Sequence, residues 1–143
     1  MHSLNTIKEQ NKSNAKKLID LTLKNGGVSF NNELLPIEFS DGFIVSIRRV
    51  VKTIDYQELE KKINHLKQNA YMLRFQGFNS EFYGIYRDNY GQFHLDRNIL
   101  LKDYQEAFNL GLRHEQISIW DCKNKVEINI TNKGINPINK GGN

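Results

Sequence analysis

The residues best suited to acid–base chemistry are His94 and Asp96, which alternate within a short strand-like segment. Alternate residues of a β-strand point to the same face of a sheet, so these two side chains are expected to lie side by side. A histidine bonded to a carboxylate is the arrangement of a general base and its orienting group. No serine or cysteine nucleophile has a motif around it, and Cys122 is expected to be a small packed hydrophobic residue. The sequence therefore predicts a protein that is not an enzyme.

Metal and cofactor sites are not indicated by the remaining polar residues. The four histidines are scattered, and a single cysteine excludes a CxxC pair and an internal disulfide. The glycine-rich phosphate-binding patterns GxxxxGK and GxGxxG do not occur. We therefore expect no metal ion and no cofactor.

Basic and aromatic residues make a better case for binding than for catalysis. Lysine and arginine outnumber aspartate and glutamate by 20 to 16, and the net charge of +4 favours an acidic or phosphate-bearing partner. The segment 74–78 (RFQGF) interleaves a cation with aromatic rings on which single-stranded bases stack. The residues predicted to bind a partner are Arg48, Arg49, Lys52, Arg74, Phe78, Arg87 and Tyr90. Two plainer interpretations stay open, namely aromatic rings packed in the core and charges scattered over a solvated surface.

The elements that position these residues follow from hydrophobic periodicity. Apolar residues mark the end of a helix predicted from Thr6 to Asn25, which stops at a pair of glycines. A strand is predicted over 43–50, with Phe43, Val45 and Ile47 on one face and Ser46 and Arg48 on the other. Asp88 to Gly91 has the Asn and Gly of a hairpin turn. Further strands are predicted over 71–76, 82–87, 92–97 and 126–130.

The tetrapeptide DYQE occurs twice, at 55–58 and 103–106, and each copy opens a predicted helix. Its aspartate is expected to cap that helix, because a carboxylate accepts from the unpaired amides of the first turn. Each copy lies between strands, so the central region follows the strand and helix order of a ferredoxin-like unit. Gly111 in the second helix would allow close approach to the sheet.

The expected fold class is α+β, with an N-terminal helix, a ferredoxin-like βαββαβ unit with extra short strands, and a disordered tail. A length of 143 residues favours one domain. This domain is expected over 1–130, with the helix within 1–26 and the core unit over 42–130. The Asn-, Gly- and Lys-rich segment 131–143 is expected to be disordered. No apolar run is long enough to span a bilayer and no signal segment opens the chain, so a soluble protein of the cytoplasm is expected.

Four segments carry a resemblance to a known group of proteins. They are 25–27 (NGG), 42–46 (GFIVS), 84–88 (GIYRD) and 110–121 (LGLRHEQISIWD). With these segments the chain resembles small phage- and plasmid-borne proteins of low-GC Gram-positive bacteria, among them type II anti-CRISPR proteins of staphylococcal mobile genetic elements. The motifs are turns and strand cores, so the resemblance transfers no active-site residue.

The resemblance implies a non-enzymatic inhibitor that binds a type II CRISPR effector nuclease or its guide-RNA complex and blocks DNA targeting or cleavage. Its exposed basic and aromatic side chains would contact an acidic protein patch or the RNA. The alternative is a nucleic-acid-binding accessory or regulatory protein of the same phage or plasmid. The sequence leaves open which effector is bound, which step is blocked and whether RNA or DNA is contacted directly.

Overall fold

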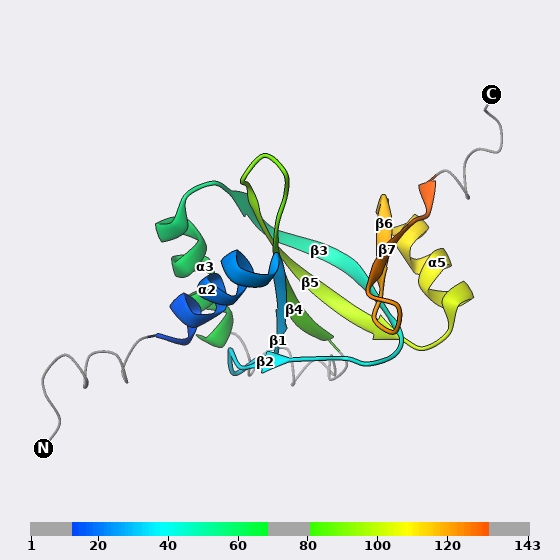
Figure 1. Cartoon of the computed structure of the whole chain (residues 1–143), viewed down its shortest axis with the longest axis horizontal. Coiled ribbons are helices and arrows are strands. Elements are labelled where there is room, and N and C mark those ends of the chain that lie inside the picture. The colour runs from blue at the N-terminus through cyan, green and yellow to red at the C-terminus, as the bar shows by residue number, and fades with distance from the viewer. Residues whose placement is uncertain (1–12, 69–80, 132–143) are drawn as a thin grey trace, which may run out of the picture.

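The computed structural model describes residues 13–68 and 81–131, and within these ranges it is an α+β structure with three helices and seven strands (Figure 1). No helix in these ranges is both long and apolar enough to cross a bilayer. The helices are α2 (Asn14–Asn25), α3 (Tyr56–Gln68) and α5 (Tyr104–Arg113). The strands are β1 (Gly27–Phe30), β2 (Pro36–Ile37), β3 (Phe43–Thr53), β4 (Glu81–Arg87), β5 (Phe93–Leu101), β6 (Ser118–Asp121) and β7 (Val126–Asn129).

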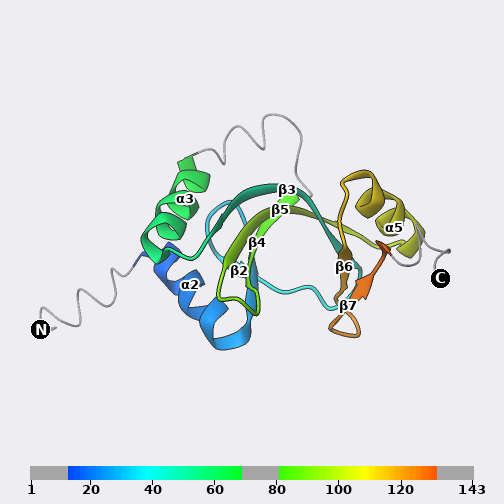
Figure 2. The ribbon, with the colours of Figure 1, turned by 90° about the horizontal axis from the view of Figure 1, so that it is seen from above.

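All seven strands belong to one antiparallel sheet with the order β2-β1-β4-β5-β3-β6-β7. The sheet curls into a half-barrel, and the three helices lie on the outside of the curl (Figure 2). We call the helix-covered side the outer face and the side within the curl the inner face.

Two irregularities in the pairing of β3 with β5 shape this curl. The register shifts between Ser46 and Arg48 and again between Arg49 and Val51. Each β-bulge adds a residue to one strand, bends it and increases its twist. The bulge between Ser46 and Arg48 also moves Arg48 to the face opposite to that of Ser46. Arg48 now lies opposite Arg97, and Arg49 lies opposite Asp96.

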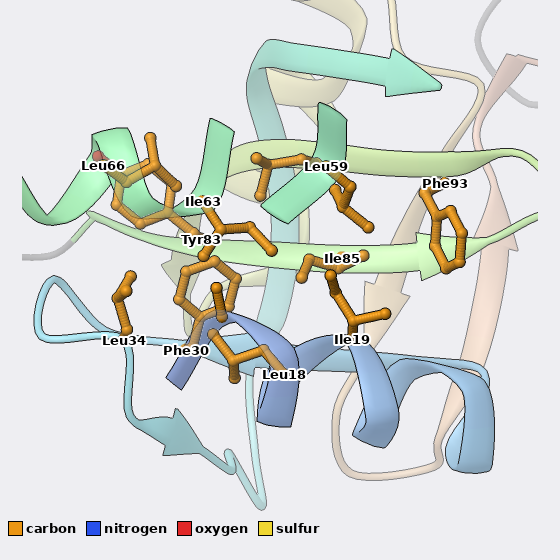
Figure 3. Packing of buried hydrophobic residues seen from close by; sticks show 12 residues of the cluster. Leu18, Ile19, Phe30, Leu34, Leu59, Ile63, Leu66, Tyr83, Ile85 and Phe93 are labelled. Atoms are coloured by element: carbon orange, nitrogen blue, oxygen red, sulfur yellow. The ribbon is translucent and has the colours of Figure 1, made fainter. Parts of the chain in front are cut away.

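The larger hydrophobic cluster joins α2 and α3 to the outer face of β1, β4 and β5 (Figure 3). The helices form because their apolar residues recur at helical spacing, as Leu59, Ile63 and Leu66 do in α3. Leu59 and Ile63 are completely buried. The remaining members of this cluster are Ala15, Leu18, Ile19, Phe30, Leu34, Tyr83, Ile85, Phe93 and Leu95.

A second, smaller cluster lies under α5 and consists of Val45, Ala107, Ile119 and Ile130. Gly111 allows this close packing, because a Cβ at position 111 would come within 2.6 Å of Ile130 Cδ1 and 3.1 Å of Ile119 Cγ2. This confirms the role expected for that glycine.

Both copies of DYQE begin helices, as the sequence predicts. Asp103 Oδ2 accepts a hydrogen bond of 2.9 Å from the amide of Glu106. Asp55 Oδ1 accepts from the amide of Gln57 at 2.8 Å and lies 3.5 Å from that of Glu58. The two aspartates are therefore helix caps.

The α+β class, the N-terminal helix ending at Asn25 and the hairpin between β4 and β5 are confirmed. The helix is described only from Asn14, so the first part of its predicted range, 6–12, lies outside the described residues. The strand predicted over 71–76 also lies outside them, as does the predicted disordered segment 131–143 except for its first residue. Thr131 is described, and its amide and hydroxyl both donate hydrogen bonds to Asn129 Oδ1. The expected alternation in β3 is wrong beyond Ser46, because the bulges change the side to which Arg48 points. The ferredoxin-like topology is a narrower claim than the α+β class and stays a prediction.

We predict that Gly111→Ala lowers the free energy of unfolding. Alanine is favoured over glycine in a helix by about 1 kcal/mol, but overpacking a core costs about 1 to 3 kcal/mol. Urea denaturation would measure the change. Asn109→Ala, at an exposed position of the same helix, is the control and should be neutral or stabilising. A Gly111→Ala protein more stable than the original would show that α5 does not need its close contact with Ile130.

We also predict that Asp103→Ala costs roughly 0.5 to 2 kcal/mol of stability, because it removes the acceptor for an amide in the first turn of α5. Asp103→Asn keeps an acceptor oxygen and should retain most of the stability. Thermal unfolding of the two variants makes the comparison. Equal losses in both would assign the effect to the charge and not to the cap.

Candidate functional site

The turn between β4 and β5 is held by the side chain of Asp88. Its Oδ1 accepts hydrogen bonds from the amides of Tyr90 at 2.9 Å and Gln92 at 3.0 Å. The backbone closes the same turn, since the Asp88 amide donates to the Gln92 carbonyl and the Gly91 amide to the Asp88 carbonyl. Gly91 has a φ of +80°, a conformation that glycine adopts without steric cost. The hairpin tip, defined as residues 88–91, is therefore a fixed structure.

His94 braces the turn from the inner face of β5. Its Nε2 lies 2.9 Å from Asp88 Oδ2, and because a carboxylate only accepts, Nε2 carries the proton. Nδ1 faces Arg49, whose Nη2 lies 3.5 Å away. The ring of Tyr86 stacks on the imidazole with a centroid separation of 4.3 Å and an interplanar angle of 5°. These contacts bury His94 to 5 % exposure.

The hydrogen bond from His94 sets the protonation state of Asp88. Together with the two turn amides, it lowers the pKa of the Asp88 carboxyl from 3.8 to about 2. Asp96 behaves oppositely, because burial raises the pKa of its carboxyl although Arg49 and His94 act against the rise. Burial also raises the pKa of the Tyr86 hydroxyl, and the charge of Asp96 adds to the effect.

The expected pair of His94 and Asp96 is on one face, but the expected hydrogen bond is wrong. The imidazole bonds Asp88 across the hairpin and not Asp96 on its own strand. Residues two apart on a strand are separated by about 6.6 Å along it, whereas the turn brings Asp88 back over His94. With one nitrogen bonded to Asp88 and the other facing Arg49, the buried imidazole is a structural brace for the turn.

Three of the predicted partner-binding residues gather at the hairpin end of the sheet. Tyr90 lies at the tip and is 88 % exposed. Arg87 stands with its guanidinium carbon 5.6 Å from the centre of the Phe93 ring on the outer face. Lys52 is exposed opposite His94, on the inner face. The structure therefore brings together only some of the residues that the sequence analysis predicted to bind a partner.

The other predicted residues lie elsewhere. Arg49 is exposed on the inner face, further along β3 from the tip than Lys52. Arg48 is exposed on the outer face, so the adjacent arginines cannot meet one flat surface together. Arg74 and Phe78 lie outside the described residues.

Sequence reasoning missed the part played by Asp88 and by the exposed rings of Tyr86 and Trp120. The role of Asp88 could have been predicted, because an aspartate commonly accepts hydrogen bonds from the amides of a tight turn that follows it in the chain. No local signal marks the two rings, because Tyr86 and Trp120 lie on strands separated by β5 and β3.

Cysteine and metal chemistry receive no support from the described part of the chain. Cys122 is 3 % exposed, and burial raises the pKa of its thiol, which disfavours the nucleophilic thiolate. Within residues 13–68 and 81–131 no group of three or more His, Cys, Asp or Glu side chains could hold a metal ion.

The low pKa of Asp88 leads to a prediction about acid stability. A carboxyl whose pKa is lowered by folding stabilises the protein above its ordinary pKa, and this contribution is lost as the pH falls through the folded value. The stability advantage of the original chain over Asp88→Asn should therefore shrink between about pH 4 and about pH 2. Urea midpoints measured across this range test it. A difference that stays constant would mean that the carboxylate charge does not hold the turn.

Comparison with known proteins adds no assignment. No protein-family model, no curated protein and no solved structure matches the chain. The function is therefore inferred from the residues and their arrangement.

Proposed function

We propose that this chain is a non-enzymatic binding protein that inhibits a type II CRISPR effector nuclease. It would bind the effector or its guide-RNA complex in the bacterial cytoplasm and block DNA targeting or cleavage. The sequence resemblance to anti-CRISPR proteins of mobile genetic elements suggests this partner. The geometry of the hairpin supports one part of the proposal, which is that the protein works by binding a partner and not by catalysis.

The observation that carries the proposal is Tyr90 at the hairpin tip. Its side chain is 88 % exposed, and the hairpin projects beyond the body of the sheet (Figure 1). The tip is fixed by the Asp88 hydrogen bonds, so binding would not have to order it. Tyrosine is enriched among residues that dominate binding energy. An exposed ring on a fixed projection therefore suits insertion into a partner.

Charge near the tip favours an acidic or phosphate-bearing surface. Arg87 and Lys52 are both exposed at the hairpin end of the sheet. The chain as a whole carries a net charge of +4. Such cations steer association and fix its register more than they raise affinity.

A role without catalysis is supported by the state of His94. Both ring nitrogens have partners within the protein, and the ring is covered by Tyr86. A general base must reach the proton it removes from a substrate. The one histidine beside carboxylates in the candidate site is thus occupied in holding the hairpin.

The fold part of the proposal is a ferredoxin-like unit formed by β3, α3, β4, β5, α5 and β6. The order β4-β5-β3-β6 within the sheet, with every neighbouring pair antiparallel, supports this assignment. Strands β1, β2 and β7 would then be additions at the two edges.

We predict that Tyr90→Ala removes inhibition. The assay is DNA cleavage by a guide-loaded type II effector nuclease with increasing amounts of this protein. Loss of a dominant binding residue costs at least about 2 kcal/mol, so the half-inhibitory concentration should rise by roughly 30-fold or more. The turn amides do not depend on the ring, so thermal stability should be unchanged.

Ile117→Ala is the matched control, because Ile117 is 67 % exposed but lies next to β6, far along the sheet from the hairpin. It should inhibit like the original chain. If Tyr90→Ala inhibits equally well, the hairpin is not the contact. If the original chain neither binds nor inhibits the effector, with or without its guide RNA, the proposed function is wrong.

A further inference from the structure

The middle of β5 forms a polar floor on the inner face of the sheet, while apolar residues, among them the buried Phe82 of β4, lie further along the same face. His94, Asp96 and Asn98 alternate along β5 with the residues that face the helices. Each of the three is between 5 % and 8 % exposed. Gly84 makes room for the Asn98 amide, which lies 2.6 Å from the position that a Cβ would take. The Asn98 amide on this floor is a group of the kind that hydrogen-bonds the edge of a flat polar ligand.

Two partly exposed aromatic rings stand on opposite sides of this floor. Tyr86 on β4 is 45 % exposed, and Trp120 on β6 is 39 % exposed. Trp120 pairs with Ile44 and Glu127, which places it on the same face as the polar floor. The sheet curls so that its two sides bend towards each other (Figure 2).

One face of the Tyr86 ring is covered by His94 at 4.3 Å, and the imidazole holds the ring parallel to itself. The ring is therefore already oriented, and its exposure lies on the side away from the histidine. A base stacking there would extend an existing stack. Stacking on an oriented ring loses little conformational freedom, which favours binding.

Exposed charge on the inner face suits a phosphate backbone. Asp88 is engaged by His94 and the turn amides, and Asp96 is buried. Arg49 and Lys52 follow one another on this face and are exposed. Glu127 on the edge strand is an exposed acid of this face, and it accepts a hydrogen bond of 2.7 Å from Ser118. The cations thus lie on β3 in the middle of the face, and the acid lies at its margin.

We propose that the inner face binds unpaired nucleotides of a single-stranded RNA, with bases stacked on Tyr86 and Trp120 and phosphates paired with Arg49 and Lys52. Unpaired bases can reach aromatic side chains, whereas bases within a duplex cannot. This inference does not rest on the proposed inhibition, because it concerns the protein alone and a face different from the hairpin tip.

The test is fluorescence anisotropy of the full chain with a labelled short oligouridine and with the same strand in a duplex. We expect tighter binding of the single strand. Tyr86→Ala and Trp120→Ala should each weaken it by roughly 5- to 150-fold, the range for loss of one base–aromatic stack. Tyr86→Phe and Trp120→Phe each keep an aromatic ring and should retain binding of the single strand. Arg49→Ala should lower the slope of log affinity against log salt by about 0.7.

Tyr90→Ala is the control that separates this inference from the proposed function, since it should leave RNA binding unchanged. Circular dichroism melting would show that each variant is folded. Equal affinity for duplex and single strand, or no loss in the folded alanine variants, would overturn the inference. A third contrary result would be that the original chain binds the effector without RNA and that Tyr86→Ala and Trp120→Ala abolish this binding. The inner face would then hold a protein segment and not RNA. Inhibition without RNA binding would leave the proposed function intact and refute this inference alone.

Discussion

The pairing of β3 with β5 is the constraint on which the rest of the described structure depends. β5 carries β4 and β1 on one side, and β3 carries β6 and β7 on the other. The two hydrophobic clusters lie at opposite ends of this ladder, since the pair Val51 and Leu95 packs in the larger cluster and the pair Val45 and Ile99 in the smaller one. The bulges at Ile47 and Val50 bend the ladder. The half-barrel curl, and with it the distinction between the inner and outer faces, follows from that bend.

The outer face supplies stability, and the inner face and hairpin supply the candidate contacts. Between the two clusters the outer face carries an ion pair, with Arg97 Nε 2.6 Å from Glu81 Oε1. Burial raises the pKa of the Glu81 carboxyl, and the arginine opposes that rise. Such a pair adds little net stability once its desolvation is counted, but loss of one partner would leave a buried charge. The apolar clusters therefore stabilise the sheet, and the ion pair lies between them.

Local chemistry determined much of the fold. The two DYQE aspartates cap helices because an amide without a partner needs a nearby acceptor, which is a matter of a few residues of chain. The hairpin turn and the glycine within α5 were predictable for the same reason, since the conformation of each depends mainly on residues close by in the chain. The shared face of His94 and Asp96 was likewise predictable, because alternate residues of a strand point to the same side. The candidate site was predictable only as a set of basic and aromatic residues.

The tertiary structure alone decided which of those residues stand together. Which face Arg48 and Arg49 each take depends on the bulge at Ile47, because that bulge sets the register of β3 against β5, and register belongs to two strands and not to one. His94 bonds Asp88 because the turn folds the chain back over the strand. Tyr86 and Trp120 share the inner face because the register of β4 with β5, and of β6 with β3, sets the side to which each ring points. The sequence determined the elements and their caps, whereas the faces and partners of the charged and aromatic side chains depended on pairing between distant strands.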